Sequence, residues 1–298
     1  MVVGDFPIDL DTVVIGSGPG GYVAAVHAAE LGQKVTVIEE NDQLGGVCLR
    51  VGCIPSKALI QVSHDYQTTL HSADEGVAAS DVNLDWSKVQ GYRGSVVQRM
   101  TNGVAYLFKK NKIDVVHGRA FLKDQHSLRV MKGDSAQTYT FKNLIIATGS
   151  HPIEIPGFKF NGRVIDSTGL LELQQQPKEL VIIGGGYIGC ELASAYANFG
   201  THVTILEGTD AILRNYEKDV VKVAQTNLEK RGVTIVTNAM AKSAVDNGNG
   251  VTVTYTLNDQ EETVNADNVC VAVGRRPNTK DVGLDQVGIK TDQRGLID

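Results

Sequence analysis

The chain has 298 residues, 42% of them hydrophobic and 32 of them glycine, and its formal net charge is −6 at pH 7. This length accommodates two domains, and the composition is typical of a soluble globular α/β protein and not of a disordered one. The acidic balance, without a dense basic tract, argues against a nucleic-acid partner. The most apolar stretch, residues 181–197, is interrupted by consecutive glycines and by Glu191, so no membrane span is predicted.

Residues 13–39 have the pattern of a nucleotide-binding unit. A short apolar strand precedes the turn Gly16-Ser-Gly-Pro-Gly-Gly21, which leads into an alanine-rich helix and a second strand. In such turns one glycine makes the bend, one lets the backbone approach a pyrophosphate, and one brings the helix against the strand. The helix N-terminus then faces the phosphate charge. We predict phosphate contacts at Gly16, Gly18 and Gly21, with Glu39 on the ribose hydroxyls.

Cys48 and Cys53 lie in the run Gly45-Gly-Val-Cys-Leu-Arg-Val-Gly-Cys-Ile-Pro-Ser-Lys57. Residues five apart on a regular helix are rotated by about 140° and separated by about 7.5 Å along the axis, which exceeds the reach of a disulfide. A bridge therefore requires an irregular turn, for which Gly52 supplies the backbone freedom. Pro55 fits a first helical turn, so we expect Cys53 at a helix start whose positive dipole end favours a thiolate. The run predicts a redox-active pair.

Three other interpretations of the cysteine pair compete. A structural disulfide is disfavoured because the N-terminus lacks the features of a signal peptide, and disulfides in such chains tend to be catalytic. A zinc site is disfavoured because Cys190 and Cys270 lie in apolar stretches without paired spacing and the seven histidines are scattered. We therefore predict no metal. Two inert buried thiols fit a pair between Gly-Gly and Ile-Pro-Ser-Lys less well than redox activity does.

Two helices and a series of β-like stretches follow the cysteine run. Helical character continues to about His71 and returns over residues 86–110. From about residue 113 to 141, β-branched and polar residues alternate around turn signals, which predicts a small antiparallel meander. Ala120 lies where this meander begins, so its backbone is a candidate for contacting a cofactor, although an ordinary strand residue fits the pattern nearly as well.

The same order of elements returns from residue 180. An apolar strand leads into Gly184-Gly-Gly-Tyr-Ile-Gly189, a helix, and a strand that ends at Glu207; in both copies the first glycine and the glutamate are 23 positions apart. Further β-like stretches follow over residues 233–264, which predicts a second meander, and Ala241, near the start of this meander, is a candidate like Ala120. Two fingerprints in the same context are far more specific than one. We predict an α/β fold with two Rossmann-like dinucleotide-binding domains of three-layer ββα architecture, each with an antiparallel meander.

These motifs resemble those of the dihydrolipoamide dehydrogenases, a class I group within the flavin-dependent pyridine nucleotide-disulfide oxidoreductases. The run Gly45–Lys57 is the most specific element, and both fingerprints, Ala147-Thr-Gly149 and Gly274-Arg-Arg-Pro-Asn278 support it. The resemblance implies FAD on the first unit and NAD on the second. The implied domains are residues 1–150 for FAD, including the redox-disulfide insertion, residues 151–276 for NAD, and residues 277–298 as the start of a central segment that returns toward FAD.

The resemblance also implies roles for single residues. Cys48 is the interchange thiol that forms a mixed disulfide with the dihydrolipoyl substrate, and Cys53 is the thiolate that contacts the flavin. Lys57 lies close to the flavin with Glu191 as its ion-pair partner, and Tyr187 covers the nicotinamide pocket. The cofactor-binding candidates are Gly16, Gly18, Gly21, Glu39, Gly45, Gly46, Cys48, Lys57, Ala120, Thr148, Gly149, Gly184, Gly186, Tyr187, Ile188, Gly189, Glu207, Ala241 and Gly274.

Glu207 distinguishes between the two nicotinamide cofactors. A carboxylate accepts a hydrogen bond from the 2′-hydroxyl of NAD and repels the extra phosphate of NADP, so we predict NAD. The same residue argues against the NADP-using glutathione reductases, whose redox motif tends to end in Pro-Lys-Lys instead of Pro-Ser-Lys. A mercuric reductase or another disulfide reductase is the alternative that the motifs leave open.

The sequence departs from the family pattern at two places. Arg50 stands between the cysteines where the family usually has asparagine, and a cation there would favour a thiolate. The sequence ends at Asp298, before the family's second flavin-contact segment and before the interface domain with a catalytic His–Glu pair, so we expect this chain alone to be truncated and incomplete for turnover. A cofactor-binding fragment without turnover is the alternative from another functional class.

The resemblance finally implies partners and a cellular location. The substrate would be dihydrolipoamide, or the lipoyl domain of a 2-oxoacid dehydrogenase complex, with NAD⁺ as the electron acceptor. The complete family protein would be a homodimer. We expect a cytoplasmic protein with neither a nucleic-acid nor a membrane partner.

Overall fold

The computed structural model describes residues 6–298. Their contacts group into two compact units. The first contains the described residues up to Ile54, Val96–His151 and Arg276–Asp298, and the second contains Pro55–Ser95 and Pro152–Arg275. Residues 55–95 thus group with the second unit, because Leu59 and Val89 are buried in its apolar core. The predicted domains are defined by the cofactor that each would bind, and they stay predictions.

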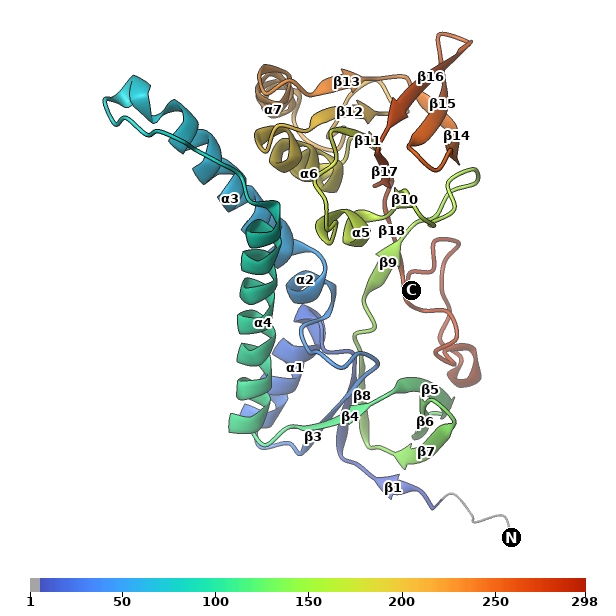
Figure 1. The fold of residues 1–298 in the computed structure, drawn as a ribbon. Helices are drawn as coiled ribbons and strands as arrows, with labels where there is room; N and C mark the ends of the chain where they lie inside the picture. Colours follow the sequence, from blue (N-terminus) through green and yellow to red (C-terminus); the bar gives the residue numbers. More distant parts are fainter. Residues whose placement is uncertain (1–5) are drawn as a thin grey trace. The chain divides into compact units, whose positions relative to one another are not determined.

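The first unit has three layers (Figure 1). Its central parallel sheet has the order β4-β3-β2-β8, formed by β2 (Thr12–Ile15), β3 (Val35–Glu39), β4 (Asp114–His117) and β8 (Asn143–Ile146). Helix α1 (Pro19–Glu30) covers one face. The other face packs on an antiparallel sheet of β5 (Arg119–Asp124), β6 (Ser127–Lys132) and β7 (Ser135–Thr140), to which β1 (Ile8–Asp9) adds in parallel.

Side-chain alternation along β2 explains these layers. Val14 is buried with Ala25 of α1, whereas Val13 and Ile15 are buried with Leu128 of the antiparallel sheet. Successive residues of a strand point to opposite faces, and a strand buried on both faces reads as a continuous apolar run. The run before the first fingerprint therefore supplies both cores at once.

The second unit repeats this arrangement. Its parallel sheet has the order β10-β17-β11-β12-β13. The strands are β10 (Val164–Ile165), β11 (Glu179–Ile183), β12 (His202–Leu206), β13 (Thr234–Val236) and β17 (Asn268–Val271). Helices α5 (Ser167–Leu171), α6 (Tyr187–Asn198) and α7 (Lys218–Lys230) pack on one face, and the meander β14 (Met240–Asp246), β15 (Val251–Leu257) and β16 (Gln260–Ala266) packs on the other.

The two units confirm the predicted α/β fold with Rossmann-like sheets, a ββα layering and antiparallel meanders. One detail of the prediction was wrong. The first β-like stretch after each helix, β4 and β13, extends the parallel sheet instead of starting the meander, because each pairs in parallel with the strand that ends in the fingerprint glutamate or just before it. Each meander then has three antiparallel strands.

The remaining elements include those predicted after the cysteine run. They are α2 (Gly46–Arg50), α3 (Cys53–His71), the 3₁₀ turn η1 (Ser72–Glu75), α4 (Trp86–Lys110), the paired strands β9 (Ser150–Pro152) and β18 (Arg275–Pro277), and the 3₁₀ turn η2 (Asp285–Val287). The predicted end of α3 and both ends of α4 are confirmed. Within residues 6–298, no helix combines the length and the apolar character that crossing a membrane requires.

Helix α3 packs along α6 of the second unit in a regular register. The Ser56 hydroxyl donates to Glu191 at 3.3 Å, and Asn198 Nδ2 donates to Ser63 Oγ at 3.3 Å. Both pairs are separated by 135 positions in the chain, so the helices run parallel and meet every seven residues, which is two helical turns. Leu59 lies between these polar contacts and is fully buried. A polar seam around an apolar centre therefore fixes this helix pair.

Candidate functional site

The first fingerprint turn is built by glycines that no other residue could replace without movement. Gly16 has φ +98°, and a Cβ on it would lie 2.3 Å from the Ala147 carbonyl oxygen. A Cβ on Gly21 would lie 1.8 Å from the Gly16 oxygen. At Gly18 a Cβ would meet only the Gly46 Cα, at 3.8 Å. Gly16 and Gly21 are thus needed for packing, while Gly18 leaves open space at the N-terminus of α1, where a pyrophosphate would approach.

The second fingerprint has the same division of roles. Gly184 has φ +105°, and a Cβ on it would lie 2.7 Å from the Ala272 oxygen. A Cβ on Gly189 would lie 2.1 Å from the Gly184 oxygen, whereas a Cβ on Gly186 would meet nothing within 4 Å. Gly186 precedes α6 with extended backbone, as Gly18 precedes α1. Both turns therefore leave room for phosphate at the same position.

The strand-end glutamate of the first unit is held by four hydrogen bonds. Ser17 donates its backbone N–H and its hydroxyl to Glu39 Oε2, at 2.9 and 2.6 Å. Asn41 donates its backbone N–H and its amide to Oε1, at 2.8 and 2.7 Å. Burial alone would raise the pKa of Glu39, but the hydrogen bonds from Ser17 and Asn41 outweigh it and hold that pKa below its ordinary value. The carboxylate is therefore charged at neutral pH.

We expect Glu39→Gln to destabilise the protein by about 1–3 kcal/mol at neutral pH, because a glutamine nitrogen would face donors in place of an acceptor. A carboxylate whose folded pKa is depressed contributes stability above its unfolded pKa and loses it as the pH falls through the folded pKa. The difference between the two proteins should therefore shrink between neutral pH and an acid pH below the ordinary pKa of a glutamate. Urea unfolding at both pH values measures it, with the exposed neighbour Glu40→Gln as the control. A gap that stays constant with pH would contradict the assignment.

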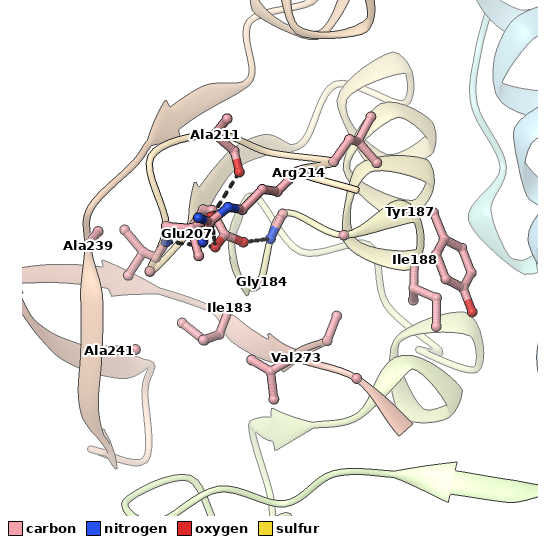
Figure 2. Close-up of a pocket in the computed structure, with 18 of the residues that line it drawn as sticks. Ile183, Gly184, Tyr187, Ile188, Glu207, Ala211, Arg214, Ala239, Ala241 and Val273 are labelled. Atoms are coloured by element: carbon pink, nitrogen blue, oxygen red, sulfur yellow. Dashed lines mark hydrogen bonds between the residues drawn. The ribbon is translucent and has the colours of Figure 1, made fainter. Parts of the chain in front are cut away.

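A cavity of about 560 Å³ opens beside the second fingerprint (Figure 2). Its volume is within the usual range for small-molecule sites. The fingerprint turn, the end of β12 and the loop after it line the cavity. Glu207 lies near one end, with Tyr187 and Ile188 towards the other. The predicted residues that the structure brings together here are Gly184, Gly186, Tyr187, Ile188, Glu207, Ala241 and Gly274.

Glu207 is held in the same manner as Glu39. The Gly185 N–H donates to Oε2 at 2.6 Å, and Thr209 donates its backbone N–H and its hydroxyl to Oε1, each at 2.8 Å. The glycine turn, the open space at Gly186 and the fixed carboxylate of Glu207 are the features that a dinucleotide-binding site requires. The residues present therefore fit such a cofactor.

The cysteine run begins directly against the first fingerprint. The Gly45 N–H donates to the Ser17 oxygen at 3.0 Å. A Cβ on Gly46, which has φ +58°, would lie 2.5 Å from the Gly18 Cα. Only glycine permits this approach of two backbones. Gly45 and Gly46 thus join the redox run to the turn where the first cofactor would bind.

The two cysteines lie on different helices, as the irregular turn predicts. Cys48 is half-buried within the short helix α2, which ends at Arg50, and Cys53 is the exposed first residue of α3. Residues 51 and 52 separate the helices. A helix N-terminus carries partial positive charge, so a negative sulfur at Cys53 lies where the dipole stabilises it. This placement is consistent with the prediction that the two cysteines have different roles in a redox-active pair.

The other two cysteines, Cys190 and Cys270, are buried, unlike Cys48 and Cys53. Burial, with a smaller contribution from the negative charge of Glu207, raises the pKa of the Cys190 thiol to about 12. Burial also raises the pKa of Cys270, which is fully enclosed, with the charge of Asp166 as the lesser cause. Both therefore stay protonated and inert at neutral pH. Within residues 6–298, no group of three or more metal-ligating side chains is arranged to hold a metal ion.

The structure does not form the expected ion pair between Lys57 and Glu191 within the described residues. Glu191 instead accepts the hydrogen bond from Ser56, and Lys57 is exposed. Consecutive helical residues point about 100° apart, so Ser56 facing α6 turns Lys57 away from it. Both Lys57 and Glu191 belong to the second unit and not to opposite sides of a domain boundary.

Three predicted positions occupy backbone or core roles. Thr148 and Gly149 follow β8, where their carbonyl oxygens accept hydrogen bonds from the Asn278 side chain and backbone, each at 2.9 Å. Ala120 is buried in the apolar core between the two sheets of the first unit. The roles of all three in cofactor binding stay predictions.

Sequence reasoning missed the residues that orient the two glutamates, namely Ser17, Asn41, Gly185 and Thr209, and it missed Ser56. A signal was present for the first four. Each donor lies at the same offset in both copies, 22 positions before the glutamate or two positions after it. A comparison of the two copies with each other, beyond their glycines, would have indicated these positions.

Comparison with known proteins identifies relatives of this arrangement. Residues 10–298 match the family described as pyridine nucleotide-disulphide oxidoreductase. The chain is 58% identical over 298 residues to the dihydrolipoyl dehydrogenases of Geobacillus stearothermophilus and of Bacillus subtilis strain 168. These alignments cover all of the chain but 63% of each relative, so the chain spans less than two thirds of their length.

Solved structures give the same fold. The HOCl-induced flavoprotein disulfide reductase RclA from Escherichia coli, in its Cu(II) complex, superposes with a TM-score of 0.85 at 31% identity and covers 97% of this chain and 62% of its own. Another structure of RclA from Escherichia coli gives a TM-score of 0.83 at 33% identity, and the alignment covers 97% of this chain and 62% of that one.

Proposed function

Because the chain belongs to the pyridine nucleotide-disulphide oxidoreductase family, we propose that it forms the dinucleotide-binding and redox portion of a dihydrolipoyl dehydrogenase that uses FAD and NAD. The observation that carries this proposal is the approach of Gly46 to Gly18, which joins the cysteine run to the first fingerprint. The relatives with 58% identity bear the same name and support the substrate class. The first unit would hold FAD and the second NAD.

The two cysteines carry out thiol–disulfide exchange in this proposal. A thiolate of the dihydrolipoyl group attacks Cys48 of an oxidised pair, the bond between the two cysteines breaks, and Cys53 leaves as a thiolate. The second lipoyl thiol loses its proton and displaces Cys48, which takes up a proton as the cyclic lipoyl disulfide departs. The start of α3 stabilises the leaving sulfur of Cys53, and lower leaving-group basicity speeds exchange.

The chain's other residues bind and orient the cofactors. Gly18 and Gly186 would admit the pyrophosphates of FAD and NAD, while Gly16 and Gly21, and likewise Gly184 and Gly189, shape the two turns. Glu39 and Glu207 would accept from the ribose hydroxyls. FAD, when bound, supplies the two-electron acceptor that reoxidises the cysteine pair and passes the electrons to NAD⁺. Tyr187, which is 57% exposed and lines the cavity, would cover the nicotinamide end. Lys57 is exposed and Glu191 is held by Ser56, so the proposed machinery does not require their ion pair.

The proposed partner is the dihydrolipoyl group of a 2-oxoacid dehydrogenase complex, with a homodimer as the assembly of the whole protein. The visible spectrum of the purified chain tests the flavin assignment, since FAD retained or taken up on addition gives the flavin bands. Addition of dihydrolipoamide should then produce a long-wavelength band from the Cys53 thiolate. A chain that binds no FAD even when FAD is added in excess would refute the flavin assignment.

A second candidate is a cofactor-binding portion without dihydrolipoamide turnover. The chain matches 63% of the length of each of the two relatives. A steady-state assay with dihydrolipoamide and NAD⁺ separates the two candidates. Turnover at the level of a full-length relative would exclude this second candidate, whereas FAD and NAD binding with no turnover would support it.

A further inference from the structure

Thr209 lies two residues after the strand-end glutamate of the second unit and fixes its carboxylate. Its backbone N–H donates to Glu207 Oε1 at 2.8 Å. Its hydroxyl lies 2.8 Å from the same carboxylate oxygen and 3.0 Å from the Ala211 carbonyl oxygen, so the charged carboxylate is the nearer acceptor for its single hydrogen. The Thr209 main chain is itself anchored, because its carbonyl accepts from the Asn238 N–H at 2.8 Å. Thr209 and Glu207 both line the cavity beside the fingerprint, where Figure 2 labels Glu207. The hydroxyl is therefore presented to the carboxylate by a rigid loop.

In the first unit, the residue at the matching position holds its glutamate with an amide in place of a hydroxyl. Asn41, also two residues after its glutamate, donates its backbone N–H and its amide to Glu39 Oε1. In both copies the other carboxylate oxygen accepts a backbone N–H from the fingerprint turn, from Ser17 or Gly185. An amide in one copy and a hydroxyl in the other thus meet the same requirement. This repetition indicates that the residue two positions after each glutamate serves to orient its carboxylate.

The hydrogen bonds leave Glu207 with a defined remaining capacity. A carboxylate has about four acceptor sites on its two oxygens. Oε1 takes both donors of Thr209, and Oε2 takes the Gly185 N–H. Glu207 is half-buried at the cavity wall, so a free acceptor site of Oε2 is accessible to a ligand from the cavity.

We propose that Thr209 is a positioning residue for cofactor selection. Its hydroxyl holds the Glu207 carboxylate in the orientation that accepts a ribose hydroxyl, and so it strengthens the binding of NAD without strengthening that of NADP. The physical reason is that a ribose hydroxyl donates to the carboxylate, whereas a 2′-phosphate has no hydrogen to donate at neutral pH and is repelled. This inference rests on the proposed function, which places NAD in this cavity.

Two variants separate the hydroxyl from the shape of the side chain. Thr209→Val keeps the shape and the backbone N–H but removes the hydroxyl, and Thr209→Ser keeps the hydroxyl but removes the methyl group. Calorimetric titration of the chain with NAD⁺ and with NADP⁺ gives the dissociation constants. We expect Thr209→Val to weaken NAD⁺ binding about tenfold, which corresponds to one hydrogen bond to a charged group. NADP⁺ binding should change less than about twofold, and Thr209→Ser should restore the NAD⁺ affinity.

The outcomes distinguish this inference from the proposed function beneath it. If the parent chain binds NAD⁺ and Thr209→Val binds it equally or more tightly, the positioning role is wrong while the proposed function stands. If Thr209→Ser is the weaker variant, the methyl group matters and the hydroxyl does not. A parent chain that binds neither cofactor overturns both. Equal urea midpoints for parent and variants show that a change in affinity is not a change in folding.

Discussion

Gly189→Ala is expected to destabilise the second unit strongly, whereas Gly186→Ala is expected to leave its stability intact and to abolish dinucleotide binding. The Cβ at residue 189 would lie 2.1 Å from the Gly184 carbonyl oxygen. Both partners are backbone, so neither can rotate away, and the helix must separate from the strand. We expect a loss of about 3 kcal/mol or more, at the upper end of the cost of overpacking. This is a large part of the stability of a typical domain.

Gly186 is the matched control because it belongs to the same turn. Its Cβ would meet nothing within 4 Å, and its extended backbone suits any residue. The alanine variant should be as stable as the parent, or more stable by about 0.4–1 kcal/mol through the unfolded state. Its methyl group would occupy the space where the pyrophosphate approaches. Urea unfolding and calorimetry with NAD⁺ measure the two effects. Unchanged stability in Gly189→Ala, or unchanged affinity in Gly186→Ala, would contradict the assigned roles.

Cys53→Ser is expected to abolish the long-wavelength absorbance that the FAD-loaded parent shows after reduction of its disulfide, whereas Cys48→Ser is expected to show that absorbance without any reductant. The reason is the position of each sulfur. Cys53 begins α3 and faces its positive end, while Cys48 lies within α2. Either variant should lower any disulfide-exchange activity by about a thousandfold or more, because the two sulfurs act as a unit. Activity alone therefore cannot tell them apart, and the spectrum can.

The measurement is the visible spectrum under nitrogen with the flavin oxidised. The parent is recorded after its disulfide has taken up two electrons, and each variant is recorded without reductant, because a single thiol takes up none. Flavin content should be equal in the parent and both variants, which makes the comparison independent of cofactor loss. Cys190→Ser is a suitable control, since that thiol is buried and protonated. A band that survives in Cys53→Ser but disappears in Cys48→Ser would reverse the assignment of the two cysteines.

The sequence predicts most of the fold because its signals are local. Glycines at fixed positions, apolar runs before them and a glutamate 23 positions after the first glycine define each Rossmann-like half without knowledge of distant contacts. The boundaries of α4 were equally predictable from composition. The assignment of β4 and β13 was not, because a short strand of alternating residues fits a parallel edge and a meander equally well. Only its pairing partner decides.

The site residues that belong to local sequence motifs were predictable. The glycines and the two glutamates lie where their motifs place them. Contacts between side chains from distant segments were missed, as the pairing of Ser56 with Glu191 illustrates. The sequence shows that Ser56 and Lys57 are adjacent, but which of them faces α6 depends on the rotation of α3 about its axis. That rotation is set by Leu59, which is buried in the core of the second unit, and by Ser63, whose partner Asn198 lies 135 positions further along the chain.

The packing of α3 and of the start of α4 on α6 also limits which segments of the chain can be expressed without the others. Trp86 contacts the rings of Tyr196 and Phe199, and Leu59 fills the same core, yet both precede the second fingerprint by about a hundred residues or more. A gene segment for residues 152–275 alone would leave this apolar surface uncovered. A chimera that exchanges the second unit between relatives must carry residues 55–95 with it. The two units therefore share a sequence pattern, but their segments alternate along the chain.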